Sequence, residues 1–512
     1  MPSEWQTFPV EFGGGLISNM SALQQGIQKV GSATFLQNFE PSKEGGYKKV
    51  LGYSKFSSTV LAGTGPVLGV KILNETQVIA VRRNNSNLSQ YYLGSGAGWT
   101  SLATASSLGG RINSVSYNFS GSNNVFFVDG VNTPAIYNGT TNALTFPSLG
   151  SDLIGTERVA VFKNSVFCSK GSLLYFSAPF LDNDFSAASG GGVINVGQNI
   201  IGMIVFRDQL IIFTKNKIRR LVGSSVADFQ LVPITDDIGC LHGETIQEVG
   251  GDIMFMAADG FRLLSATERI GDFGLGVASS PINKDAINFL NSTEVFTSLV
   301  IREKAQYRVF AYSPSVNIDI SKGLIGTQFS DQGSTNINWA TLSGFKVYSA
   351  DSRYVTGGEF IVFANDTGYV YRMEFGATRD GSTIDAKYRS PFMPIDDPQV
   401  RKTFYKLSLF TEVNGNFGVN VNLDFDIFEV SNYNKNPANT IVLSSSGSGV
   451  TIFGSPSSVY GTSTYGGTLD DVYNTNVVGS GKTVSLRIED NSTNPSFSLD
   501  TAVLEYKVNG RK

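Results

Sequence analysis

A two-strand unit that recurs along the middle of the chain constrains its fold more than any other feature. In residues 251–266, GDIMFMAADGFRLLSA, an apolar run meets the turn Ala258-Asp259-Gly260, and a second apolar run leads away. Asp-Gly between two apolar runs is a strong hairpin signal, because these residues accept the backbone angles of a tight turn. We predict related hairpins at 75–93, 124–138, 164–178, 208–222 and 359–375, and a looser one that begins at Gln306.

The spacing of these units predicts the architecture. Successive hairpins begin roughly 40 to 55 residues apart, which is the period of β-propeller blades. A single hairpin cannot bury its apolar face alone, so the copies must stack against one another. We therefore predict an all-β chain in which residues 61–384 form a β-propeller of six or seven blades. A short helix is predicted at 280–291, with Ser280 as N-cap and Pro281 in its first turn.

The two ends of the chain have patterns of their own. Residues 1–60 are polar and rich in glycine, and we predict an extended segment that braces or closes the propeller. Residues 385–512 are predicted to form an additional antiparallel, sandwich-like β domain, because apolar residues alternate strictly along several stretches. Two of these stretches, 405–413 and 417–427, predict a hairpin. Three prolines within 389–400 predict a rigid linker, and the Gly/Ser/Tyr-rich stretch 444–481 predicts a long loop.

The composition argues against several classes of protein. Charged residues make up 16% of the chain, against about 25% in typical soluble domains. The net charge is −4 and no Lys/Arg-rich run occurs, so the basic footprint of a DNA-binding protein is absent. Cys168 and Cys240 are far apart, which predicts neither a disulfide framework nor a zinc site. The sequence shows no signal-peptide pattern and no bilayer-length apolar stretch, so we expect a soluble protein, without membrane insertion, made in a reducing cytoplasm.

Two short motifs are candidates for chemistry, and we interpret both as structural. The sequence GSGKT at 479–483 resembles the end of a phosphate-binding loop, but Asn476 stands where the motif requires its first glycine. The alternation of Val484, Leu486 and Ile488 predicts a strand after it, whereas a phosphate-binding loop opens a helix. Cys240 and His242, the only histidine, could share a strand face as a thiolate–imidazole pair, but no third group orients them.

Acidic residues offer another route to catalysis. A glycosidase needs two carboxyl groups about 5–10 Å apart, and four acidic pairs occur: Asp236/Asp237, Asp396/Asp397, Asp424/Asp426 and Asp470/Asp471. Neighbouring residues of a strand point to opposite faces, and Asp424 and Asp426 are predicted to share a solvent face. We therefore predict no catalytic residues, no metal site, no cofactor and no enzymatic activity. Carboxylates brought together from distant blades remain an open alternative.

Several stretches of the chain share their pattern with a known protein family. They are FPVEFGGGLISNMSALQQG, SATFLQNFEPSKEGGYKKVLGYSKF, AADGFRLLSATERIGD with ASSPINKDAINFL, FMPIDDPQVRKTFYKLSLFTEVNGNFGVNVNLDFD, and the terminal VNGRK. The sequence resembles the tail nozzle proteins of short-tailed phages (podoviruses), also called tail tubular protein B or tail stabilisation protein. The stretches are turns, a capped helix and strands, so the resemblance concerns structure and carries no catalytic residues over.

The resemblance implies a β-propeller with an added β domain, assembled as a homo-hexameric ring in the virion tail. It also implies contacts with a portal adaptor and with a tail fibre or tailspike, and a contact with a tail needle or plug is a further option. Double-stranded DNA would pass through the ring transiently, without sequence-specific binding, as the genome is retained and then ejected. A modestly acidic chain suits such a channel, because phosphate contacts of Lys and Arg would add affinity and slow passage.

Two alternatives stay open. The first is a propeller-based glycan-binding or glycan-cleaving tail protein that recognises a receptor, although no turn here matches the Asp-box (Ser-x-Asp-x-Gly-x-Thr-Trp) typical of propeller sialidases. The second is a cellular scaffold propeller. The sequence does not indicate which residues line or gate a channel, which tail component touches which face, or the role of 444–481.

Overall fold

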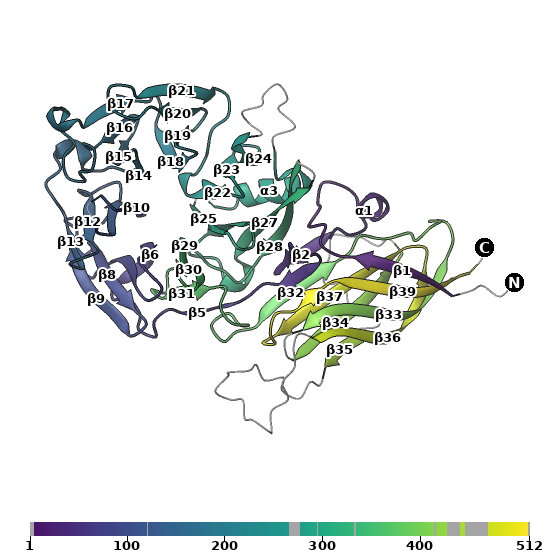
Figure 1. The fold of residues 1–512 in the computed structure, drawn as a ribbon. Helices are drawn as coiled ribbons and strands as arrows, with labels where there is room; N and C mark the ends of the chain where they lie inside the picture. The colour runs from purple at the N-terminus through teal and green to yellow at the C-terminus, as the bar shows by residue number, and fades with distance from the viewer. Residues whose placement is uncertain are drawn as a thin grey trace.

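The structure, a computed structural model, describes residues 5–119, 121–265, 277–293, 295–331, 334–413, 416–426, 441–445 and 469–509. Within these residues the chain is almost entirely β-structure. Seven antiparallel sheets of the described chain surround one axis as the blades of a propeller, and a β-sandwich domain lies beside them (Figure 1). The predicted all-β fold, a propeller with an additional antiparallel domain, is therefore confirmed.

The first four blades each contain four strands in chain order. Blade 1 contains β6 (Thr64–Ile72), β7 (Val78–Arg83), β8 (Ser89–Ser95) and β9 (Gly98–Thr104). Blade 2 contains β10 (Asn113–Tyr117), β11 (Asn124–Val128), β12 (Ala135–Asn138) and β13 (Ala143–Thr145). Blade 3 contains β14 (Arg158–Phe162), β15 (Ser165–Lys170), β16 (Leu173–Phe176) and β17 (Gly192–Asn195). Blade 4 contains β18 (Ile200–Phe206), β19 (Gln209–Thr214), β20 (Ile218–Val222) and β21 (Gln230–Thr235).

The last three blades are less regular. Blade 5 has three strands, β22 (Gln247–Val249), β23 (Asp252–Ala257) and β24 (Gly260–Leu263). Blade 6 is formed by β25 (Val295–Ile301), β26 (Gln306–Tyr312), β27 (Lys322–Asp331) and β28 (Ser334–Leu342). Blade 7 joins β29 (Ser349–Val355), β30 (Gly358–Ala364) and β31 (Val370–Met373) to β5 (Tyr53–Lys55) from the N-terminal segment. Since β5 pairs with β31, the ring is closed by strands from two distant parts of the chain.

Each predicted hairpin forms the middle of a blade. The hairpins pair β7–β8, β11–β12, β15–β16, β19–β20, β23–β24 and β30–β31, and the looser one from Gln306 pairs β26–β27. In blade 5 Ala257 lies opposite Gly260, whose φ of +137° favours glycine. The seven predicted hairpins are thus confirmed, one for each blade.

Packing between blades explains why these hairpins are so apolar. In β11 all five residues are buried. Val125 and Phe127 pack in the core shared with blade 1, whereas Phe126 and Val128 pack in the core shared with blade 3. A strand that is covered on both faces reads as a continuous apolar run rather than an alternation. The same pairwise cores continue around the ring, and the core between blades 7 and 1 completes it.

The short helices connect the blades and the N-terminal segment. The predicted helix at 280–291 is a 3-10 turn, η4 (Ser280–Ile282), followed by α3 (Asn283–Leu290). Ser280 belongs to the turn itself, and no side chain caps either helix at its start, so its predicted capping role was wrong. Other short helices within the described ranges are α1 (Ala22–Gln28), η1 (Ser151–Leu153), η2 (Ala187–Ser189), η3 (Gly243–Thr245) and η5 (Ile318–Ile320).

The N-terminal segment runs between the propeller and the sandwich domain. Its strands are β1 (Gln6–Glu11), β2 (Phe35–Gln37), β3 (Phe39–Pro41) and β4 (Tyr47–Lys49). The sandwich strands are β32 (Ile384–Arg389), β33 (Lys402–Val413), β34 (Phe417–Phe425), β35 (Ile441–Ser445), β36 (Leu469–Gly481), β37 (Val484–Ser492), β38 (Ser498–Leu499) and β39 (Thr501–Val508). One sandwich sheet has the order β1-β39-β33-β36. The other, β32-β37-β34-β35, continues through β2 into blade 6 as a single nine-stranded sheet.

The structure corrects the prediction of a hairpin from 405–413 and 417–427. β33 pairs with β36 and β39, whereas β34 pairs with β35 and β37, so the two strands lie in opposite sheets. Two consecutive amphipathic strands can bury their apolar faces by pairing in one sheet or by facing each other across a sandwich. A bulge at Tyr405 also shifts the alternation, so Phe404 is buried and Tyr405 is exposed.

The structure adds to one further prediction for this domain and corrects another. The predicted rigid linker, 389–400, connects β32 to β33 and packs into the core, because Phe392, Met393 and Ile395 are buried and the backbone of Met393 hydrogen-bonds to that of Val484. Of the predicted loop 444–481, residues 469–481 form β36, and residues 446–468 lie outside the described residues. The glycines of β36 interrupt the alternation of apolar residues by which a strand is recognised in a sequence. A side chain at Gly479 would collide with the ring of Phe425, which packs directly on the strand.

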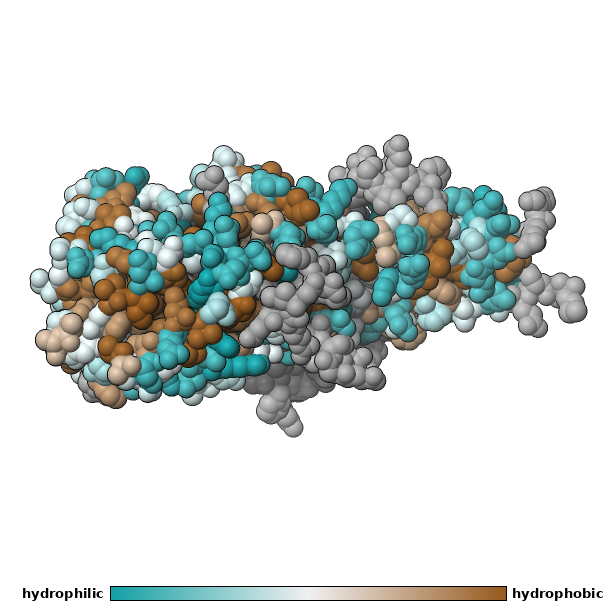
Figure 2. Space-filling model, turned by 90° about the horizontal axis from the view of Figure 1, so that it is seen from above, coloured by the Kyte–Doolittle hydropathy of each residue, from teal (hydrophilic) through white to brown (hydrophobic). Residues whose placement is uncertain are grey.

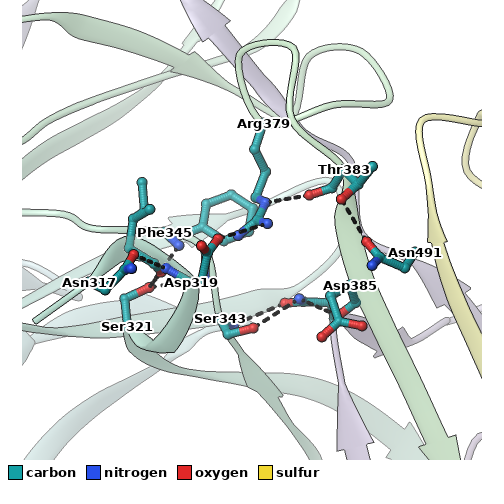
Figure 3. A network of polar contacts seen from close by, with 12 residues as sticks. Asn317, Asp319, Ser321, Ser343, Phe345, Arg379, Thr383, Asp385 and Asn491 are labelled. Carbon is teal, nitrogen blue, oxygen red and sulfur yellow. Dashed lines mark hydrogen bonds and ion pairs between the residues drawn. The ribbon is translucent and has the colours of Figure 1, made fainter.

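Buried charges and a polar network tie the sandwich domain, the N-terminal segment and the blades together. Lys49 of β4 and Asp490 of β37 form a buried ion pair at 2.6 Å. Arg308 of β26 is fully buried between Glu40 of β3 and Glu374, both at 2.7 Å. Figure 3 shows a second junction, in which Arg379 donates to the carbonyl oxygen of Thr383 at 2.7 Å and pairs with Asp319. These contacts fix the two domains as one body.

Candidate functional site at the two ends of the propeller axis

The first strand of each blade lies nearest the axis (Figure 1). These inner strands are β6, β10, β14, β18, β22, β25 and β29. We name the end where the inner strands begin the first mouth, and the end where they finish the second mouth. Residues from blades that are distant in sequence meet at these two places, which makes them the natural positions for a site in this fold.

Arg111 crosses the first mouth. It lies just before β10 of blade 2 and donates from Nη1 to the carbonyl oxygen of Phe296 in blade 6 at 2.6 Å. Its Nη2 donates to Oγ1 of Thr297 at 2.6 Å and to the carbonyl oxygen of Tyr348, just before blade 7, at 2.8 Å. Hydrogen bonds to a charged donor are among the stronger ones in proteins. Arg111 therefore ties one side of the ring to the other.

Glu244 lies beside this bridge. It belongs to η3, and its carboxylate accepts a hydrogen bond from Nη1 of Arg158, the first residue of β14. Burial alone would raise the pKa of Glu244, but the charges of Arg158 and Arg111 outweigh it and hold the pKa below its usual value. The carboxylate therefore stays ionised and bound to arginine. Glu244 supplies the single carboxylate among these hydrogen-bonded residues, whereas glycoside hydrolysis uses a pair of carboxyl groups.

Cys240 and His242 lie in the connection from blade 4 to blade 5, outside any strand. The Cys240 thiol is buried and donates to the backbone carbonyl oxygen of His242 at 3.2 Å, and the His242 ring packs on Phe296. Burial raises the pKa of Cys240 to about 11. At neutral pH the thiol is protonated, and it lacks the thiolate character of a nucleophile.

Among the acidic pairs whose side chains the structure describes, none is brought together as a catalytic dyad. Asp236 pairs with Arg219 and Lys217, and Asp424 lies 3.1 Å from both Arg389 and Arg487. The prediction that Asp424 and Asp426 share a solvent face was wrong. Asp426 has a φ of +57° beyond the end of β34, which turns the chain away from the strand direction. Asp396 accepts a hydrogen bond from the Tyr506 hydroxyl, and the side chains of Asp470 and Asp471 lie outside the described residues.

The GSGKT motif ends one strand and leads into the next. Residues 479–481 are the last of β36, and β37 begins at Val484, so the predicted turn before a strand is confirmed for Lys482 and Thr483. The backbone N–H of Lys482 donates to Oδ1 of Asp426 at 2.7 Å, so this turn already binds a carboxylate of the chain itself. No group of three or more His, Cys, Asp or Glu side chains in the described part of the chain is placed to hold a metal ion. None of its helices has the length and apolarity to cross a membrane.

The second mouth holds a polar pocket between blades 1, 2 and 7. Its volume is about 150 Å³, and side-chain amides dominate its lining: Asn74, Gln77, Asn123, Asn124 and Asn142. Ser116, Tyr137 and Arg353 contribute further polar groups. Arg353 holds the blades in place there, because its Nη1 donates to the carbonyl oxygens of Ile72 and Leu73. A wider groove of about 610 Å³ adjoins the pocket, and Tyr354 is among its lining residues.

Comparison with known proteins gives no family assignment. No protein-family model and no curated protein sequence matches the chain. Among solved structures, the extracellular domain of a hybrid two-component system from B. thetaiotaomicron is similar at 9% identity and a TM-score of 0.39 over 62% of this chain. The chain spans 40% of that protein's length. The extracellular domain of a one-component system from the same organism gives 9% identity and a TM-score of 0.40, over 69% of this chain and 43% of that one.

An exo-β-1,3-galactanase from Phanerochaete chrysosporium is similar at 11% identity and a TM-score of 0.25, over 89% of this chain and all of that one. At these TM-scores the similarities carry no argument about function. The function must therefore be argued from the surfaces and pockets of the chain itself.

Proposed function

We propose that the chain is a structural subunit of a short-tailed phage tail nozzle, and that six copies form a ring around a DNA channel in the virion tail. The proposal combines the sequence resemblance with one structural observation. Exposed large apolar side chains are spread over the described chain, and they include one set on the propeller and one set on the sandwich domain. Figure 2 shows apolar side chains exposed over the propeller half of the molecule.

We name the first area the blade-3 surface, which consists of Phe180, Leu181 and Val193. The second, the outer-sheet surface, consists of Trp5, Tyr405, Phe410 and Val472. Phe410 and Val472 lie opposite each other on β33 and β36, and the rings of Trp5 and Tyr405 are 4.5 Å apart. A closed ring requires two different surfaces on each copy, because each subunit contacts its two neighbours with opposite sides. Aromatic and apolar side chains are enriched in such interfaces.

The charge of the chain also supports a conduit. A net charge of −4 per copy is multiplied around a ring, and DNA phosphates are repelled rather than bound. The rigid junction between the propeller and the sandwich domain suits a subunit that must keep its shape as the genome passes. The portal adaptor, and a tail fibre or tailspike, are the partners that this function requires.

The mass of the native assembly tests this function. Purified full-length chain, analysed by native mass spectrometry and electron microscopy with and without a candidate adaptor, is expected to form rings of six copies. A protein that stays monomeric alone, with the adaptor and inside assembled virions would contradict the proposal.

The amide-lined pocket favours a second function, the recognition of a glycan receptor by a tail protein. Its polar lining is uncharged apart from Arg353, which is the character of a saccharide site rather than of a protein interface. A glycan array probed with the purified chain tests this function, and binding to none of the glycans would exclude it.

A further inference from the structure

The second of the two functions can be assigned to a place on the chain. We propose that the second mouth binds a neutral saccharide, with one pyranose ring in the amide pocket and the adjoining sugar residue against Tyr354. The inference rests on the glycan-recognition function proposed above and is independent of ring assembly.

The size of the pocket limits its occupant to about one six-membered ring. Its volume is about 150 Å³, and an engineered protein cavity of about 150 Å³ binds benzene. The wider groove shares Leu73, Asn74 and Arg353 with the pocket, so the two lie next to each other. A ligand with one ring in the pocket can therefore extend along the groove as a longer chain.

The amides of the pocket present donors to its interior. Oδ1 of Asn142 accepts from the Tyr137 hydroxyl at 2.6 Å, and Oδ1 of Asn124 accepts from the Gly139 backbone N–H at 3.2 Å. Oε1 of Gln77 accepts from Nδ2 of Asn74 at 2.9 Å. In each case the protein holds the amide through its oxygen. Asn124 bonds with the Tyr117 hydroxyl and Asn74 donates to Gln77, so Gln77 and Asn142 are the amides whose N–H groups are left for a ligand. Hydroxyl oxygens of a sugar accept such hydrogen bonds.

Ser116 supplies an independent observation. It lies near the end of β10, and its Oγ is buried without a hydrogen-bond partner among the described residues. Buried hydroxyls in proteins nearly always have a partner. Ser116 lines the pocket, so rotation of its side chain toward the interior would pair this hydroxyl with a sugar hydroxyl, which can both donate to it and accept from it.

The charges around the pocket favour a neutral ligand. Arg353 is the single cation of the lining, and it already donates to two backbone carbonyl oxygens. Glu75 stands at the groove with its carboxylate bound to the Gly357 backbone N–H at 3.0 Å. The formal charges of Arg353 and Glu75 cancel, whereas an anion site presents cations to its ligand.

Tyr354 provides the apolar contact that a sugar ring needs. It lines the groove and is 63% exposed, far more than a side chain used for packing inside the blade. An aromatic ring offers a rigid apolar face with a polar tip at little entropic cost. The C–H face of a pyranose can stack on this ring while its hydroxyls bond to the amides.

The test is saturation-transfer NMR on the full-length chain with lactose, maltose and N,N′-diacetylchitobiose, and with inorganic phosphate as the anionic probe. At least one neutral disaccharide is expected to bind. Tyr354→Ala and Ser116→Ala are each expected to weaken that binding by about fivefold to tenfold, the effect of one lost contact. Ser116→Ala removes no hydrogen bond within the described protein, so its unfolding midpoint should not fall. Ile320→Ala, which shortens an exposed apolar side chain of η5, is the control and should bind as the unaltered chain does.

Three results would overturn the inference. If no neutral disaccharide binds and the glycan array is also negative, the glycan function fails together with the site. If a glycan binds but Tyr354→Ala and Ser116→Ala leave its affinity unchanged, the function stands and the site is elsewhere. If phosphate binds more tightly than every neutral disaccharide, the pocket is an anion site.

Discussion

Glu374 shows how a single residue can make the fold sensitive to acid. It follows β31 and pairs with Arg308 at 2.7 Å and with Lys304. Burial alone would raise its pKa, but the two cations outweigh burial and lower the pKa below 4.5. A carboxylate with a lowered pKa stabilises the fold above its unfolded-state pKa, and this contribution disappears as the pH falls through the folded-state pKa.

We expect Glu374→Gln to lower the free energy of unfolding at pH 7 by about 1.5–3 kcal/mol, because it removes hydrogen bonds to two charged groups. The difference from the unaltered chain should shrink as the pH falls below about 4.5. Urea unfolding at a series of pH values between 3 and 7 measures both effects. Glu248→Gln, which changes an exposed carboxylate, should leave stability unchanged. A constant difference at every pH would contradict the assigned role.

The two cysteines are expected to be inert in the folded chain. Both are buried, and burial raises the pKa of each thiol, that of Cys240 to about 11. Since only the thiolate reacts, a disulfide reagent such as dithionitrobenzoate should label neither cysteine at pH 8 within minutes and both after unfolding in guanidinium. Rapid labelling of one thiol in the folded chain would show that the loop around Cys240 or the core around Cys168 opens readily.

At the scale of strands, β5 closes the ring of blades because it pairs with β31 of blade 7. Ser54 on β5 lies directly opposite Arg372 on β31, although the two residues are far apart in sequence. Cysteines at directly opposite positions of antiparallel strands are close enough to form a disulfide. The Ser54→Cys, Arg372→Cys double variant should therefore gain about 2–4 kcal/mol on oxidation.

Urea unfolding of the oxidised and reduced double variant measures this gain, with each single variant as a control for the substitutions themselves. An oxidised form no more stable than the reduced one would indicate that the pairing of β5 with β31 is not maintained in solution. The blades would then close in another way.

The sequence predicts the blades well because each blade repeats one local signal. In β11 and its counterparts a strand buried on both faces is followed by a tight turn, and both features lie within about 15 residues of chain. The partners of β33 and β34 could not be predicted in this way, because the alternation of apolar residues in these two strands fits a hairpin and a sandwich equally. Only the partners β36, β37 and β39, which come later in the chain, decide between them.

The two mouths could not be predicted for a similar reason. Arg111, Arg158 and Glu244 precede or begin the inner strands of three different blades, and no local pattern connects them. Asn74, Ser116 and Arg353 likewise follow or end the inner strands of blades 1, 2 and 7. Once the blade register is known, a usable signal exists: polar residues at equivalent ends of the inner strands face one mouth.

At the scale of the whole molecule, the two exposed surfaces determine what kind of assembly can form. The blade-3 surface and the outer-sheet surface belong to different domains, which lie side by side in one rigid body (Figure 1). Contact of like surfaces would give a two-fold dimer, whereas contact of unlike surfaces gives a ring or a filament. Substitutions that block one surface at a time distinguish these arrangements.

We expect Phe180→Asp, which blocks the blade-3 surface, and Val472→Asp, which blocks the outer-sheet surface, each to be monomeric. Both side chains are exposed, at 59% and 48%, so neither variant should unfold. An equimolar mixture of the two variants should form dimers and nothing larger, because each copy retains the surface that the other lacks. Native mass spectrometry measures these species, and Val226→Asp, exposed on blade 4, is the control that should still form rings. Larger assemblies from either variant alone, or monomers only in the mixture, would show that these two surfaces do not contact each other.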